Sequence, residues 1–108
     1  MEADADGIIA LTTLPSTEKA AEIGRTLVEE GVVACATLVP GARSIYRWQG
    51  QLCDDAETLV VLKTCRDRVK ALEHRLAALH PYDVPELIVL PVTGGHEPYL
   101  RWLRTNTR

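Results

Sequence analysis

The sequence lacks several features that mark common classes of protein. Phenylalanine is absent, and two tryptophans and three tyrosines are the only aromatic residues among 108. RNA-recognition modules stack bases on aromatic side chains of their central strands. The apolar runs at residues 32–39 and 59–63 contain no aromatic residue, so we do not expect an RNA-binding sheet. No apolar run is long enough to cross a bilayer, so we expect no membrane partner.

Residues that build reactive or metal centres are few and scattered. Cys35, Cys53 and Cys65 form no Cys-x-x-Cys pair, which argues against a disulfide framework and a zinc knuckle. The three histidines form no His-x-x-x-His motif, and the Gly94-Gly95 pair lacks the remainder of a phosphate-binding loop. We therefore expect a protein that is not an enzyme.

The charge balance argues against polyanionic partners. Twelve Lys and Arg residues face 15 Asp and Glu residues, which gives a net charge of -3 and a pI near 5.6. Such a chain has no general attraction for nucleic acid. The acidic start lacks the basic and apolar stretches of a secretory leader, so we predict a flexible tail at residues 1–6, a single domain at 7–108 and a cytoplasmic location.

Hydrophobic periodicity predicts alternating strands and helices. Ser16 can cap a first helix whose apolar face includes Leu27 and Val28, and Asp67 can cap a second helix that ends at Pro81. Gln49-Gly50 suits the turn of a hairpin arm, although Asn would suit the first position better. Expected strands cover residues 8–14, 32–39 (ended by Pro40-Gly41), 58–64 and 85–92, and a short helix opens at Glu97-Pro98.

This order predicts an α+β fold of the ferredoxin-like split βαβ type, with a β-hairpin arm and a short C-terminal helix. Both long helices then cover one face of the sheet, yet the strands are apolar on both faces. We expect other copies of the chain to cover the second face. A monomer whose arm folds back over its own sheet is the alternative.

A group of polar and aromatic residues is the candidate site. It comprises Tyr46, Arg47 and Trp48 on the arm, Lys63 on a strand, and the run at residues 80–86 that includes His80, Tyr82 and Glu86. Such residues can form either a ligand pocket or a hydrogen-bonded interface, and the sequence leaves both open.

Three stretches resemble the CutA family of divalent-cation tolerance proteins. They are residues 33–50 (VACATLVPGARSIYRWQG), 62–64 (LKT) and 80–91 (HPYDVPELIVLP), followed by an ending with Tyr99 and Trp102. The resemblance implies a ferredoxin-like subunit in a homotrimer, a cytoplasmic location and tolerance of copper and other divalent cations, without a catalytic reaction.

The chain departs from copper-binding members of that family at two positions. Thr12 stands where they carry a cysteine, and Leu79 precedes His80 where they carry a second histidine. We therefore expect at most weak Cu(II) or Zn(II) binding, through His80 and Glu86. His80 can instead cap the helix end, with an accessible ring that bonds a free carbonyl. The alternative function is a signal-transducer-type regulatory module that binds a small anionic metabolite at subunit clefts through Lys63 and Arg47.

Overall fold

A computed structural model describes residues 6–107 of the chain. The elements follow in the order β1 (Gly7–Leu14), α1 (Thr17–Glu29), β2 (Cys35–Trp48), β3 (Gln51–Cys65), a 3-10 turn (Arg66–Arg68), α2 (Val69–Leu79), β4 (Ile88–Pro91) and α3 (Glu97–Thr105). The four strands form one antiparallel sheet in the order β2-β3-β1-β4. The predicted α+β, ferredoxin-like fold is confirmed. Most of the predicted acidic tail lies outside the described residues.

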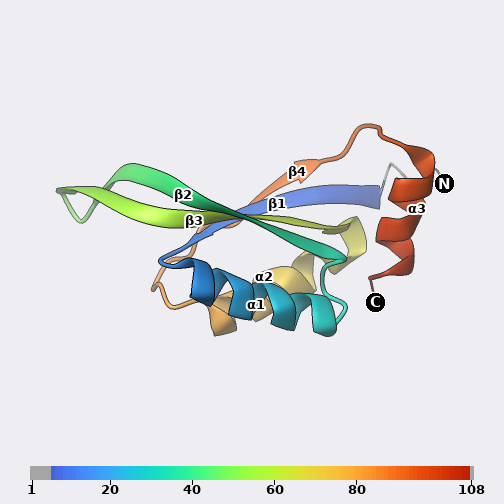
Figure 1. Cartoon of the computed structure of the whole chain (residues 1–108), viewed down its shortest axis with the longest axis horizontal. Coiled ribbons are helices and arrows are strands. Elements are labelled where there is room, and N and C mark those ends of the chain that lie inside the picture. Colours follow the sequence, from blue (N-terminus) through green and yellow to red (C-terminus); the bar gives the residue numbers. More distant parts are fainter. Residues whose placement is uncertain (1–5, 108) are drawn as a thin grey trace.

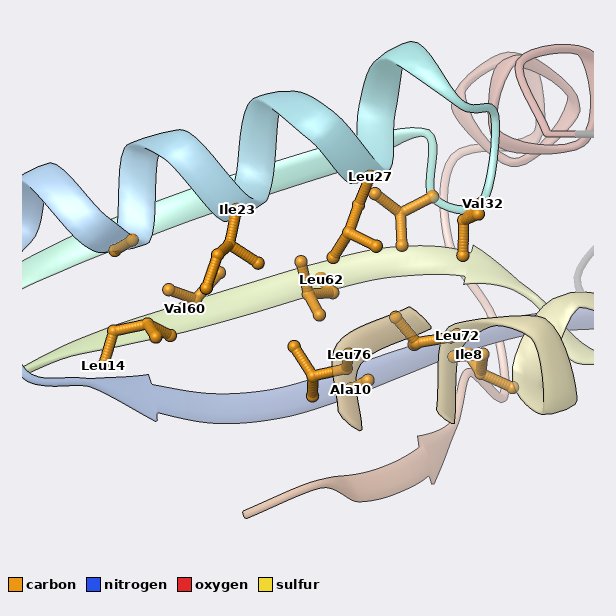
Figure 2. Packing of buried hydrophobic residues seen from close by; sticks show 12 residues of the cluster. Ile8, Ala10, Leu14, Ile23, Leu27, Val32, Val60, Leu62, Leu72 and Leu76 are labelled. Atoms are coloured by element: carbon orange, nitrogen blue, oxygen red, sulfur yellow. The ribbon is translucent and has the colours of Figure 1, made fainter. Parts of the chain in front are cut away.

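Both long helices lie on the same face of the sheet, as Figure 1 shows. The core between them is built from side chains that alternate along β1 and β3 and recur at helical spacing on α1 and α2. Figure 2 shows Ile23 and Leu27 of α1 directed at Val60 and Leu62 of β3, with Leu72 and Leu76 of α2 completing the layer. The strand residues that lie between these core positions therefore point to the opposite face of the sheet.

Local signals explain the first helix. Ser16 caps α1 as predicted, because its Oγ accepts a hydrogen bond from the Lys19 backbone N–H at 3.1 Å. Gly31, with a φ of 74°, follows the last turn. Val28, which we placed on the apolar face, is 39% exposed, because it lies one position beyond the buried Leu27.

The expected end of the second strand is wrong. β2 runs on through Pro40 and Gly41 to Trp48, and a bulge between Val39 and Ala42 absorbs both residues. Since β2 is an edge strand, the proline breaks no inner ladder. The β2–β3 pair forms one long hairpin that extends past the helices in Figure 1, and the predicted arm is its outer half.

Two further boundaries differ from the prediction. Asp67 does not cap α2: it lies within the 3-10 turn, and Arg68 occupies the N-cap position without a side-chain hydrogen bond. β4 covers only Ile88–Pro91, because β1 pairs with it over just four residues. The segment that precedes β4 is irregular and is free to line a pocket.

Neither long helix lies on the second face of the sheet, and α3 packs only at one end of β1 and β3, where the Lys63 Nζ is 5.8 Å from the centre of the Tyr99 ring. The register of β1 with β3 and β4 places a set of apolar side chains on this second face, half-buried on the inner strands and exposed on β4. We call this set the open face; it comprises Ile9, Leu11, Val39, Leu59, Val61, Ile88 and Leu90. It agrees with the sequence-based expectation of strands that are apolar on both sides.

Candidate functional site

A pocket lies between the arm and the segment after α2. Its volume is about 640 Å³. The arm supplies its aromatic wall, the segment at residues 82–86 supplies the opposite wall, and the end of β1 contributes one residue. The lining residues are Thr13, Ser44, Ile45, Tyr46, Trp48, Asp55, Glu57, Tyr82, Asp83, Val84 and Glu86.

Strand alternation places the two aromatic side chains of the arm at this pocket. Tyr46 pairs with Cys53 and Trp48 with Gln51 in the β2–β3 register, which puts both rings on the same side of the arm as Glu57. Arg47, one position away, points to the opposite side and does not line the pocket. That opposite side also holds the Arg43–Asp54 ion pair at 2.7 Å.

Two tyrosine hydroxyls bind carboxylates of the pocket. The Tyr46 hydroxyl donates to Asp55 Oδ2 at 2.5 Å, and the Tyr82 hydroxyl donates to Glu57 Oε2 at 2.6 Å. The hydrogen bond to Asp55 raises the pKa of Tyr46, and burial together with the bond to Glu57 raises the pKa of Tyr82. Both hydroxyl protons are thus held in place as donors, and both rings are fixed.

The imidazole of His80 lies behind this wall rather than in it. Its Nε2–H donates to the Thr13 carbonyl at 2.8 Å, and its Nδ1 accepts from the Tyr82 N–H at 3.2 Å, which defines a neutral tautomer. Burial lowers the pKa of His80, opposed by the bond to Thr13 and by the charge of Glu57. The ring bonds a carbonyl of β1 rather than one at the end of α2, so it does not cap the helix as the alternative expected, and the expectation of an accessible ring is wrong, since His80 is 7% exposed.

The pocket is strongly acidic. Four lining residues are carboxylates, and none is lysine or arginine. Glu57 is 8% exposed, and among the ion pairs of residues 6–107 none involves it. Partial burial, and secondly the nearby Glu57 carboxylate, raises the pKa of Glu86. The structure therefore gathers uncompensated negative charge between aromatic walls.

The structure brings together only part of the candidate set. Tyr46, Trp48, Tyr82 and Glu86 line one pocket. Lys63 lies at the other end of the sheet, where it pairs with Cys35 and where its Nζ is 5.8 Å from the centre of the Tyr99 ring. Arg47 is twelve residues further along β2 than Cys35, roughly 40 Å at about 3.3 Å per residue.

Two pocket carboxylates, Asp55 and Glu57, were missed from the sequence. Asp55 and Glu57 are two residues apart on β3 and share a face, and Asp83 lies in the run already singled out. The spacing of Asp55 and Glu57 was the available signal. It could be used only once the hairpin register was known, because the register decides whether they face Tyr46 or Arg47.

The residues around His80 in this chain do not fit a copper or zinc ion. Both ring nitrogens already have partners, and the Thr12 hydroxyl is buried in the core where a thiolate ligand would be needed. Within residues 6–107, no group of three or more His, Cys, Asp or Glu side chains is arranged to hold a metal. We therefore derive no chemical step through a metal at this position.

The chain has a ferredoxin-like fold with an extended arm and an acidic cleft. The sequence matches the family described as CutA1 divalent ion tolerance protein over residues 8–106, and the chain belongs to that family. None of the helices in residues 6–107 is long and apolar enough to span a membrane.

Similarity extends over nearly the whole chain. The divalent-cation tolerance protein CutA of Thermus thermophilus is 48% identical over 99 residues, which cover 92% of this chain and 96% of that protein. A solved structure of the Thermus thermophilus protein matches with a TM-score of 0.91 at 47% identity, covering 94% and 99% of the two chains. The structure of CutA1 from Oryza sativa matches with a TM-score of 0.94 at 37% identity, covering 99% and 98%. The Arabidopsis thaliana protein CutA, chloroplastic, is 40% identical over 94% of this chain and 56% of that protein.

Proposed function

We propose that the chain acts as a homotrimer in tolerance of divalent cations, copper among them, by binding or as a scaffold and without catalysis. The single observation that carries the assembly is the open face. A wide apolar surface is rare on a monomer, and here it covers all four strands, with Ile88 and Leu90 exposed at its edge.

The edges of the sheet support a closed ring. β2 and β4 are the two edge strands, so each leaves one row of backbone N–H and C=O groups unpaired within the subunit. Pairing the β2 edge of one copy with the β4 edge of the next is a head-to-tail contact, which forms a ring when its rotation closes. The open faces would then turn toward the axis, and the CutA resemblance implies three copies.

The charge of the pocket favours a cation over the small anionic metabolite of the alternative function. An anionic metabolite would need Lys63 and Arg47 together, but they lie at opposite ends of one subunit. The pocket beside the arm carries carboxylates and no basic residue. Because like charges repel in a partly buried site, this pocket disfavours an anion. The regulatory-module alternative would therefore require a site assembled from different subunits.

Direct metal binding by His80 and Glu86 stays a prediction of weak affinity. A Cu(II) or Zn(II) ion would have to displace one of the two hydrogen bonds of the ring and take further ligands from a partner subunit. Titration calorimetry with each ion on the parent and on His80→Ala tests it. Equal binding by both, with the same assembly, would exclude His80 as a ligand. A cytoplasmic location is likewise part of the proposal.

Ile88→Glu tests the trimer directly. Ile88 is 50% exposed in the subunit, so a charge there leaves the core intact but falls within the proposed contact. Light scattering after gel filtration should give a trimer for the parent and a smaller species for the variant. Val28→Glu, on the outer side of α1, is the matched control and should remain trimeric. A monomeric parent at micromolar concentration would contradict the proposal.

A further inference from the structure

The pocket beside the arm has the size and walls of a site for an organic molecule. Its volume of about 640 Å³ falls in the range of roughly 300–1,000 Å³ that is typical of small-molecule sites. Tyr46, Trp48 and Tyr82 contribute aromatic surface, and Val84 lies in the opposite wall. A bare divalent ion needs a tight cage of oxygens at about 2.0–2.6 Å instead. No such group of side chains occurs in residues 6–107.

The buried Glu57 carboxylate lacks the charge that would balance it. Its side chain is nine-tenths buried and accepts one hydrogen bond from the neutral Tyr82 hydroxyl. None of the ion pairs in residues 6–107 includes it. A carboxylate removed from water without a cationic partner is unfavourable. Since Asp55, Asp83 and Glu86 surround the same space, a positively charged occupant would relieve both the desolvation and the mutual repulsion.

Hydrogen bonding narrows the class of occupant. The carboxylates are acceptors, and the hydroxyl protons of Tyr46 and Tyr82 already point at Asp55 and Glu57. The pocket thus mainly offers acceptors, which an ammonium group, with only donors, complements. Aromatic faces attract the same cation within about 6 Å of a ring centre.

We propose that this pocket binds a small organic ammonium ion, with its nitrogen among the carboxylates of Asp55, Glu57 and Asp83 and its carbon chain against Trp48 and Tyr82. The pocket is lined by residues of one copy of the chain, and the proposal does not depend on metal binding.

Titration calorimetry at constant ionic strength tests the proposed ammonium site, with three ligands of equal length and different charge. They are the four-carbon diamine putrescine, the corresponding diol and succinate. Putrescine should bind the parent saturably with one site per subunit, whereas the diol and succinate should give no binding. Equal binding of diamine and diol, or no binding of millimolar putrescine to the parent, would overturn the proposal.

Charge-neutralising variants locate the site. Glu57→Gln should weaken putrescine binding about tenfold or more, the usual effect of losing one charge-assisted hydrogen bond. Asp83→Asn, on the exposed segment, should also weaken putrescine binding. If Glu57→Gln does not fold, this variant tests the location of the site. Glu73→Gln makes the same charge change on the exposed side of α2 and should bind like the parent. If Glu73→Gln weakens binding as much as the pocket variants, the effect is general charge and the proposed site is wrong. Light scattering on each variant separates loss of binding from loss of assembly.

Discussion

At the scale of single residues, His80 shows how a residue with the chemistry of a ligand can serve the fold. Its two ring nitrogens join the end of β1, through the Thr13 carbonyl, to the segment after α2, through the Tyr82 N–H. The ring centre also lies 4.8 Å from that of Tyr82. His80 therefore holds the tyrosine that in turn donates to Glu57, and it positions one wall of the pocket without entering it.

This role predicts a defined loss of stability in acid. Because burial lowers the pKa of His80, the folded ring resists protonation while the unfolded ring, with a pKa near 6.5, takes up a proton. The stabilisation is complete above about pH 6.5 and is lost as the pH falls from there toward the lower folded pKa. The free energy of unfolding, measured against pH at fixed protein concentration, should fall less steeply in this window for His80→Ala than for the parent.

His74→Ala is the control for that experiment, since it removes an imidazole from the exposed side of α2, the helix that precedes His80. Its pH profile should follow that of the parent. A profile of His80→Ala that runs parallel to the parent between about pH 7 and about pH 5, the range around the ordinary imidazole pKa, would show that the buried ring does not contribute the expected proton linkage.

At the scale of elements, most predictions that depend on local spacing are confirmed, and those that depend on register were missed. The cap at Ser16 and the Gln49-Gly50 turn follow from neighbouring residues and are present, whereas the Asp67 cap and the place of Val28 on the apolar face were wrong. The continuation of β2 past Pro40 and Gly41 was missed because a bulge on an edge strand tolerates both residues, and periodicity alone does not reveal a bulge.

In the candidate site, too, some residues were found from the sequence and others could be placed only from the strand register. Of the residues singled out, the run at residues 80–86 contributes Tyr82 and Glu86 to the pocket, and the arm contributes Tyr46 and Trp48. Arg47 was grouped with Tyr46 and Trp48 because the three are consecutive, but strand alternation sends it to the opposite side. The carboxylates of β3 came within reach of the pocket only through pairing with a strand that precedes them in the chain.

The turn of the arm offers a stabilising substitution. Gln49 has a φ of 50° and Gly50 a φ of 79°, the two left-handed positions of a type I′ turn. A left-handed conformation costs an ordinary residue about 1–2 kcal/mol, and Asn tolerates it better than Gln. Gln49→Asn should raise the free energy of unfolding by up to about 1 kcal/mol, measured in denaturant, whereas Gly50→Ala should lower it. A loss of stability in Gln49→Asn would show that the glutamine side chain is needed there.

At the scale of the whole molecule, the buried core is separate from the open face and from the pocket. The two long helices cover one face of the sheet, and most of the other face consists of the apolar side chains of four strands. The long hairpin reaches beyond this body, and the longest dimension of the molecule is 46 Å against 25 Å and 23 Å for the others. An isolated two-stranded arm is marginally stable in water, so its outer half needs a surface on which to pack.

Trp48 is the largest side chain near the tip of that arm, and it tests whether a neighbouring subunit supplies the surface. Buried aromatic anchors typically contribute about 2 kcal/mol or more to an interface. Trp48→Ala should therefore shift the trimer toward smaller species on dilution, as measured by light scattering, and lower the unfolding temperature. Trp102→Ala is the matched control for Trp48→Ala, since Trp102 is 43% exposed and Trp48 is 42% exposed. Trp102 differs in that its ring stacks on Tyr99 of the same helix, α3. The control should change the dilution profile far less. Equal profiles for the two variants would mean that the arm does not anchor the assembly, and that the contact rests on the open face alone.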